Sequence, residues 1–210
     1  MEAEKFEISK IFPSLYTASS QRVKLVEAPS LRVLAISGEG TKDSPRHQES
    51  VAALQAVAYG LKNLASEGLE VGDFINFNLT ALECLHSSND GGNYDPGLHK
   101  DGLWELCYVV PGFVSPRLVK IVQIELSKKD SNEKIAEVHV NTLQEKKCAQ
   151  IMHLGSHENI YKSYLKLMAY IKRHGYKPSS RFHEIYLNNP DPNTKGRHKT
   201  ILRQPIVKMG

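Results

Sequence analysis

Two glutamates stand inside segments that otherwise have the residue pattern of buried β-strands. Glu184 lies in RFHEIYL, and Glu83 lies in TALECLH. Because the side chains of a strand alternate between its two faces, Phe182, Glu184 and Tyr186 share one face. An unpaired carboxylate is costly to bury, so each glutamate is expected to pair with another group, face solvent or contact a ligand.

Aromatic residues accompany both carboxylates. Trp104 and Tyr108 share one face of the intervening segment GLWELCYVV, with Leu106 between them. Two interpretations stay open. In the first, the rings belong to the core, and the glutamates pair with an arginine or reach a sheet edge. In the second, the rings form the walls of a pocket with a carboxylate at its floor, which suits a flat, lipophilic and often cationic ligand.

The predicted elements that position these residues occur twice in the same order. Ser44-Pro45 and Ser115-Pro116 each combine an N-cap serine with a proline at the first helical position. Gly68 and Gly175 are the predicted ends of the first and last helices. In chain order, the predicted elements are strands at 22–27 and 31–37, a helix at 45–66, strands at 74–83 and 102–110, a helix from 116 to about 128, strands near 134–142 and 147–154, a helix at 158–174, and strands at 181–187 and 199–207.

The order strand, helix, strand, strand therefore repeats. LRVLAISGEG before the first helix corresponds to CAQIMHLGSH before the last one. We expect an α+β fold, namely a tandem β-α-β-β repeat with antiparallel sheets and helices around a central ligand pocket. Residues 1–210 are predicted to form a single domain, with pseudo-repeats at about 20–112 and 113–207.

The overall composition is that of an ordinary globular chain. The 210 residues are 40% hydrophobic and 24% charged, and no apolar run approaches the roughly 20 residues that span a bilayer. The charged N-terminus has no signal-peptide pattern and the three cysteines are widely spaced, so we expect a cytoplasmic protein without a membrane partner. The net charge of +4 comes from scattered basic pairs, which disfavours specific nucleic-acid binding.

Three segments resemble known cofactor or metal motifs, but none of them supports such a site. GEGTKD follows a strand, but Asp43 stands where a dinucleotide-binding G-x-G-x-x-G has its third glycine. His183 and Glu184 begin like the zinc-protease motif H-E-x-x-H, but Leu187 occupies the position of the second histidine. His153 and His157 fit a solvated strand end better than a metal site. We therefore predict neither a metal nor a cofactor.

Around Glu83, Trp104 and Glu184 the sequence resembles the GyrI-like small-molecule-binding family. This family is related to the effector-binding domains of multidrug-sensing bacterial regulators. The resemblance extends over about residues 20–207. It is carried by LRVLAISGEG, HQESVAALQAVAYGLK, LECL, DGLWELCYVVPGFVS and CAQIMHLGSH, and most specifically by HEIYLNNP followed by KTILRQPI. The family fold is a tandem β-α-β-β repeat around a central pocket, which agrees with the repeat predicted above.

The resemblance also implies a site. It implies that Glu184 lies at the pocket floor, that Glu83 lines the same site and that Trp104 supplies a wall. The family often has L-E-G-L-W where this chain has LECLH, so His86 replaces a tryptophan. The candidate catalytic residues are Glu184, Glu83 and Tyr186, and the candidate ligand-binding residues are Trp104, Tyr108, Phe182 and His86.

The function stays open between catalysis and binding. Some free-standing members of the family hydrolyse cyclopropanoid DNA-alkylating compounds, so the resemblance implies a candidate hydrolase in detoxification. Burial would raise the pKa of Glu184 toward neutrality and suit it as a general base, while Tyr186 or Tyr108 would donate a hydrogen bond to the oxygen that gains charge. The alternatives are a non-catalytic sensor or sequestering module for lipophilic aromatic or cationic compounds, and a gyrase-inhibitor-like protein-interaction module. The oligomeric state is left open.

Overall fold

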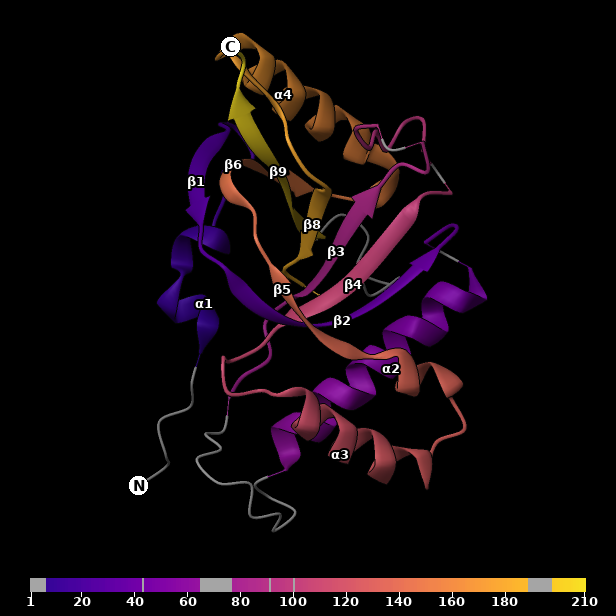
Figure 1. The fold of residues 1–210 in the computed structure, drawn as a ribbon. Coiled ribbons are helices and arrows are strands. Elements are labelled where there is room, and N and C mark those ends of the chain that lie inside the picture. Colours follow the sequence, from indigo (N-terminus) through magenta and orange to yellow (C-terminus); the bar gives the residue numbers. More distant parts are fainter. Residues whose placement is uncertain (1–6, 43, 65–76, 91, 100, 189–197) are drawn as a thin grey trace.

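An antiparallel sheet of nine strands runs through the part of the chain that the computed structural model describes, which is residues 7–42, 44–64, 77–90, 92–99, 101–188 and 198–210 (Figure 1). The strands are β1 (Lys24–Ala28), β2 (Leu31–Glu39), β3 (Leu82–Ser87), β4 (Leu103–Val109), β5 (His139–Leu143), β6 (Lys146–Leu154), β7 (Tyr176–Pro178), β8 (Phe182–Tyr186) and β9 (Lys199–Lys208). Their order in the sheet is β1-β6-β9-β8-β3-β4-β2-β5, and β7 pairs with β9.

The helices differ in the face of the sheet that they cover. They are α1 (Ile8–Ile11), α2 (Pro45–Asn63), α3 (Pro116–Ser127) and α4 (Ile160–Arg173), with 3₁₀ turns η1 (Pro13–Leu15), η2 (Glu133–Glu137) and η3 (His157–Asn159). Leu106, Cys84, Glu184 and Leu202 are aligned across four strands and therefore share one face. Leu106 packs beneath α2 and α3, and Leu202 packs beneath α4, so these three helices cover the same face (Figure 1). None of the described helices is long and apolar enough to cross a membrane.

The N-terminal segment covers the opposite face. Ile8 of α1 and Leu15 of η1 pack in a separate apolar cluster with Val33 of β2 and Cys107 of β4. Cys107 is aligned with Glu83, which alternation directs away from the face that α2 and α4 cover. The sheet is thus buried on both sides, and this explains why the sequences of its strands are nearly continuous apolar runs.

The two halves of the sheet repeat one topology. The first repeat has β2, α2, β3 and β4 in chain order, and the second has β6, α4, β8 and β9. In the sheet the two repeats meet where β3 pairs with β8, and we call this junction the seam. Each repeat also receives an outer strand from the other half, because β1 pairs with β6 and β5 pairs with β2. The predicted α+β tandem repeat is confirmed.

The helix starts follow from local capping. The hydroxyl oxygens of Ser44 and Ser115 accept hydrogen bonds from the backbone N–H groups of His47 and Leu118, as the two Ser-Pro pairs predict. The structure describes α2 to Asn63, and the end predicted near Gly68 lies outside the described residues.

Two predicted strands start later than expected. Residues 74–76 of the strand predicted at 74–83 are not described, and β3 begins only at Leu82. Residues 134–137 belong to the 3₁₀ turn η2 instead of a strand. Ile135 and Val138 are three residues apart and both are buried, while Gln123 donates to both of their carbonyl oxygens. This local packing against α3 competes with strand pairing.

The tight contact between Gly38 of β2 and Trp104 of β4 can be tested by mutation. Gly38 pairs with Trp104, and a β-carbon added at Gly38 would overlap the indole ring. We expect Gly38→Ala to displace this ring and to lower the free energy of unfolding by about 1–3 kcal/mol, as overpacking does in other cores. Urea unfolding followed by tryptophan fluorescence measures this change.

Gly112 provides the matched control for this substitution. An added β-carbon at Gly112 meets no atom within 4 Å, and its backbone is not left-handed. Gly112→Ala should therefore leave the free energy of unfolding within about 0.5 kcal/mol of the wild-type value. Equal stabilities of the two variants would contradict the proposed ring contact.

Candidate functional site

Glu184 lies at the seam with its carboxylate fully covered. Its side chain is 0% exposed, and the Tyr186 hydroxyl donates a hydrogen bond of 2.8 Å to Oε2. Nε2 of His157 lies 3.3 Å from Oε2, and Nε2 of His86 lies 3.6 Å from Oε1. Nζ of Lys42 lies 3.8 Å from Oε2. Four polar groups, contributed by both repeats, therefore surround one buried carboxylate.

This surrounding keeps Glu184 ionised. Burial raises its pKa, but His86, His157 and Lys42 together lower it to well below its ordinary value. Burial lowers the pKa of His86 to about 4, so His86 is neutral near pH 7 and the ammonium of Lys42 is left as a cationic partner of Glu184. The prediction that burial raises the pKa of Glu184 toward neutrality is wrong, because it considered desolvation without these partners.

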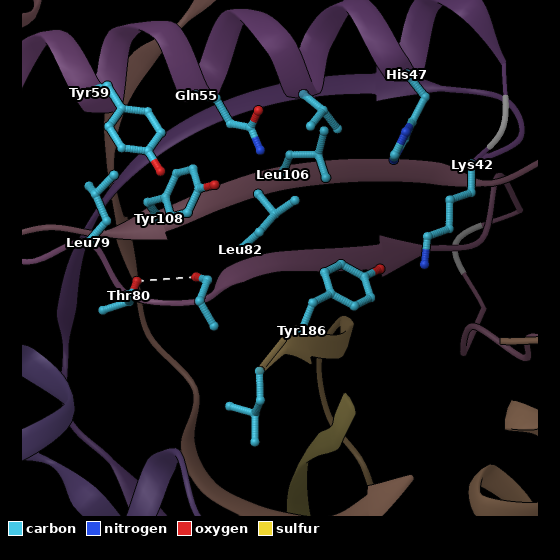
Figure 2. Close-up of a pocket in the computed structure, with 13 residues that line it drawn as sticks. Lys42, His47, Gln55, Tyr59, Leu79, Thr80, Leu82, Leu106, Tyr108 and Tyr186 are labelled. Carbon is cyan, nitrogen blue, oxygen red and sulfur yellow. Dashed lines mark hydrogen bonds between the residues drawn. The ribbon is translucent and has the colours of Figure 1, made fainter. Parts of the chain in front are cut away.

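Two adjoining cavities lie on the same face of the sheet. The first has a volume of about 400 Å³ and the second about 460 Å³, and Lys42 and His47 line both of them. Figure 2 shows the first cavity between α2 above and strands β4, β3 and β8 below, with Lys42 at one end near Tyr186. Its wall residues are Lys42, His47, Val51, Gln55, Tyr59, Leu79, Thr80, Ala81, Leu82, Leu106, Tyr108, Tyr186 and Leu187.

The second cavity extends from Lys42 toward the start of α4. It combines residues of the first repeat, including Trp104 and His86, with residues of the second, including His157 and Tyr161. Tyr94, from the loop between β3 and β4, stacks on His86 with ring centroids 4.7 Å apart. Aromatic and imidazole rings therefore supply much of the wall of this cavity.

The predicted ligand-binding residues differ in which of the two cavities they line. Tyr108 lines the first cavity, and Trp104 and His86 line the second. Phe182 is fully buried behind these walls, where it stacks on Tyr94 at a centroid distance of 5.8 Å. Phe182 is not among the residues that line either cavity, so it supports the wall of the second cavity from behind through Tyr94.

The expectation that Glu83 lines the same site as Glu184 is wrong. Glu83 is aligned with Ile185 and not with Glu184, so the two carboxylates point to opposite faces of the sheet. Oε1 of Glu83 accepts a hydrogen bond of 3.1 Å from the Tyr16 hydroxyl, and Oε2 lies 2.9 Å from Nε2 of His183. This environment lies beneath the N-terminal segment, away from both cavities.

Glu83 instead belongs to a buried ionic cluster. Nδ1 of His183 lies 2.9 Å from Glu145, whose carboxylate also accepts a hydrogen bond of 3.0 Å from Arg203. Arg203 is nearly fully buried and donates further hydrogen bonds to Gln150 and to the carbonyl of Leu15. These contacts tie the N-terminal segment to the sheet.

Sequence reasoning missed Lys42 and His157 as site residues. Lys42 lies in GEGTKD, which the sequence indicated to be a glycine-rich turn, and His157 was interpreted as part of a solvated strand end. Both residues lie between the first strand and the helix of their repeat. The repeat was the signal that could have found them, because equivalent loops converge at the seam. Among the described residues, no group of three or more His, Cys, Asp and Glu side chains could hold a metal ion.

Residues 117–206 match the family model of the GyrI-like small molecule binding domain. The resemblance to the GyrI-like family is confirmed over this stretch. The matched range contains His157, Glu184 and Tyr186, whereas Lys42 and Trp104 precede it. The GyrI-like match thus covers the part of the site that the second repeat contributes.

Solved structures extend the similarity over nearly the whole chain. A Listeria innocua protein described as a hydrolase has a TM-score of 0.85 at 22% identity, over 97% of this chain and 100% of that chain. An uncharacterized conserved protein from Listeria innocua has a TM-score of 0.87 at 23% identity, over the same shares of 97% and 100%. The C-terminal domain of EcmrR has a TM-score of 0.60 at 15% identity, over 90% of this chain and 98% of that chain. These similarities establish the fold, and comparison with curated proteins found no match.

The ionic cluster around His183 predicts how stability depends on pH. Burial lowers the pKa of His183, but Glu145 and Glu83 raise it by more, so that it reaches about 9. Because this folded-state value exceeds the value of about 6.5 in an unfolded chain, the protonated histidine stabilises the fold. The stabilisation is complete below about pH 6.5 and is lost as the pH rises toward 9.

Urea unfolding between about pH 6 and pH 9 measures this dependence. Wild type should lose stability across this range, and His183→Gln, although less stable throughout, should lose much of that slope. His139→Gln is the control, because His139 is exposed and lies outside the cluster. An unchanged slope in His183→Gln would show that His183 does not carry the pH dependence.

Proposed function

We propose that this protein binds a flat, lipophilic small molecule in the two adjoining cavities at the seam. The match of residues 117–206 to a small-molecule-binding domain supports this function. The observation that carries it is the pair of cavities, because each volume lies within the range of about 300–1,000 Å³ that is typical of ligand sites. We also propose that residues 1–210 act as one domain with pseudo-repeats at about 20–112 and 113–207, since both halves line the second cavity.

The chemistry of the walls supports a flat and largely apolar ligand. Tyr59, Tyr108 and Tyr186 line the first cavity together with aliphatic side chains, and Trp104 and Tyr161 line the second. Aromatic faces favour stacking with planar ligands. A sensing or sequestering role in the cytoplasm, including multidrug binding, would need only this binding step.

Calorimetry with uncharged planar compounds tests the binding function. Flavone, carbazole and 2-naphthamide are suitable probes, and at least one is expected to bind saturably to the wild-type protein. Val51 lines the first cavity from α2, so Val51→Trp should fill part of it and weaken binding by about tenfold or more.

The matched control is Val207→Trp, which adds the same ring at an exposed position of β9. This variant should bind as tightly as the wild type. The proposal would be abandoned if none of the probes bound, or if Val51→Trp and Val207→Trp bound a probe equally well.

Hydrolysis of a cyclopropanoid electrophile, as a detoxification reaction, is a second candidate. It is favoured by the contact between buried Glu184 and His157, whose side chain is 46% exposed beside the second cavity. The low pKa of Glu184 makes it a weak base. The group placed to take a proton from a water molecule in the cavity is therefore His157, with Glu184 orienting the imidazole. The Tyr186 hydroxyl already donates to Glu184, which argues against its expected role as the donor to a developing oxyanion.

Rates with a spirocyclopropane alkylating compound separate the hydrolase from the binder. A hydrolase using this pair should lose about 100-fold or more of its rate in both Glu184→Gln and His157→Gln. Product formed at wild-type rates by both variants would exclude this mechanism. Saturable binding without any product would favour the non-catalytic function.

A further inference from the structure

We propose that the ligand is an aromatic acid whose anionic group binds between Lys42, which lines both cavities, and His157, which lines the second. This inference rests on the proposed small-molecule-binding function and narrows its ligand class. It replaces the cationic ligand that the carboxylate of Glu184 suggested on the basis of the sequence.

The groups that a ligand meets first are basic. Glu184 is fully buried and is not among the residues that line either cavity. The side chain of Lys42 is 34% exposed and lines both cavities, and that of His157 is 46% exposed and lines the second. A ligand that enters the first cavity therefore meets the ammonium of Lys42, and a ligand that enters the second meets both this ammonium and the imidazole of His157.

The charge of Glu184 is already balanced. Nζ of Lys42 lies 3.8 Å from Oε2, so the pair presents little net negative charge to a ligand. A cationic ligand that contacts Glu184 would have to displace Lys42 or lie beside it. Two positive charges within a few ångströms of each other repel. An anionic ligand would give Lys42 a second partner, because an ammonium has three N–H donors.

The aromatic surface next to Glu184 is also occupied. Nζ of Lys42 lies 4.2 Å from the centroid of the Tyr186 ring, within the distance of a cation–π contact. A ligand cation could not use this side of the ring while Lys42 holds it. Lys42 thus weakens the attraction that Glu184 and the Tyr186 ring would have for a ligand cation.

One acidic residue, Glu158, also lines the second cavity. Glu158 is exposed, so solvent and salt screen its charge more than they screen the partly covered Lys42. Glu158 is therefore expected to weaken the preference for an anion slightly and not to reverse it.

Three ligands with one ring system test the proposal by calorimetry near neutral pH. These are 2-naphthoate, which is anionic, 2-naphthamide, which is neutral, and 2-naphthylmethylammonium, which is cationic. We expect 2-naphthoate to bind wild type about tenfold or more tightly than 2-naphthylmethylammonium, with 2-naphthamide between them.

Variants at Lys42 and Glu184 identify the groups responsible. Lys42→Met leaves Glu184 without its ammonium partner, so the order of affinities should reverse in favour of the cation. Lys42→Arg should retain the preference for the anion. Lys42→Met combined with Glu184→Gln removes both charges, so the three ligands should bind with similar affinities even if Lys42→Met alone is poorly folded.

Lys120→Met is the control, because Lys120 is exposed on α3 and lines neither of the two cavities. It should keep the wild-type order of affinities. Equal affinities in the wild type, or tightest binding of the cation, would overturn this proposal and leave the binding function intact. If none of the three ligands bound while flavone or carbazole did, this proposal would fail and the binding function would stand. If flavone and carbazole did not bind either, both would fail.

Discussion

The buried carboxylate of Glu184 is the constraint on which the seam depends. A fully covered negative charge is stable only if nearby groups replace the water that it has lost. Tyr186 of the same strand, His86 of the neighbouring strand, and Lys42 and His157 of two separate loops fulfil this need. Because these groups come from both repeats, compensation of one charge fixes the loops that border the two cavities.

A second ionic cluster lies on the other face of the same strands. His183 and Glu184 are adjacent in β8, and strand alternation directs one beneath the N-terminal segment and the other toward the cavities. This second cluster joins His183 to Glu83 and Glu145 and holds the N-terminal segment to the sheet. The two carboxylates that look equivalent in the sequence therefore have different functions, one in holding the fold together and one in shaping the site.

Much of the fold could be predicted because its signals are local. The Ser-Pro caps and the apolar spacing predicted α2 and α3, and alternation correctly grouped Trp104 with Tyr108 and Glu184 with Tyr186. The site was predicted less well. The prediction that Glu83 and Glu184 line one site was wrong, because the register between strands decides which side chains share a face. The predicted shift in the pKa of Glu184 had the wrong direction, because the partners that lower this pKa, His86, His157 and Lys42, lie far away in the chain.

The sequence by itself determined the three long helices α2, α3 and α4, most of the strands, the repeat and the residues that share a face within each strand. These depend on capping, periodicity and alternation, which act over a few neighbouring residues. Only the tertiary structure decided that Lys42 and His157 balance Glu184, and that Glu83 pairs with His183 instead. Such pairs depend on strand register and on where two loops converge, and no local pattern encodes either.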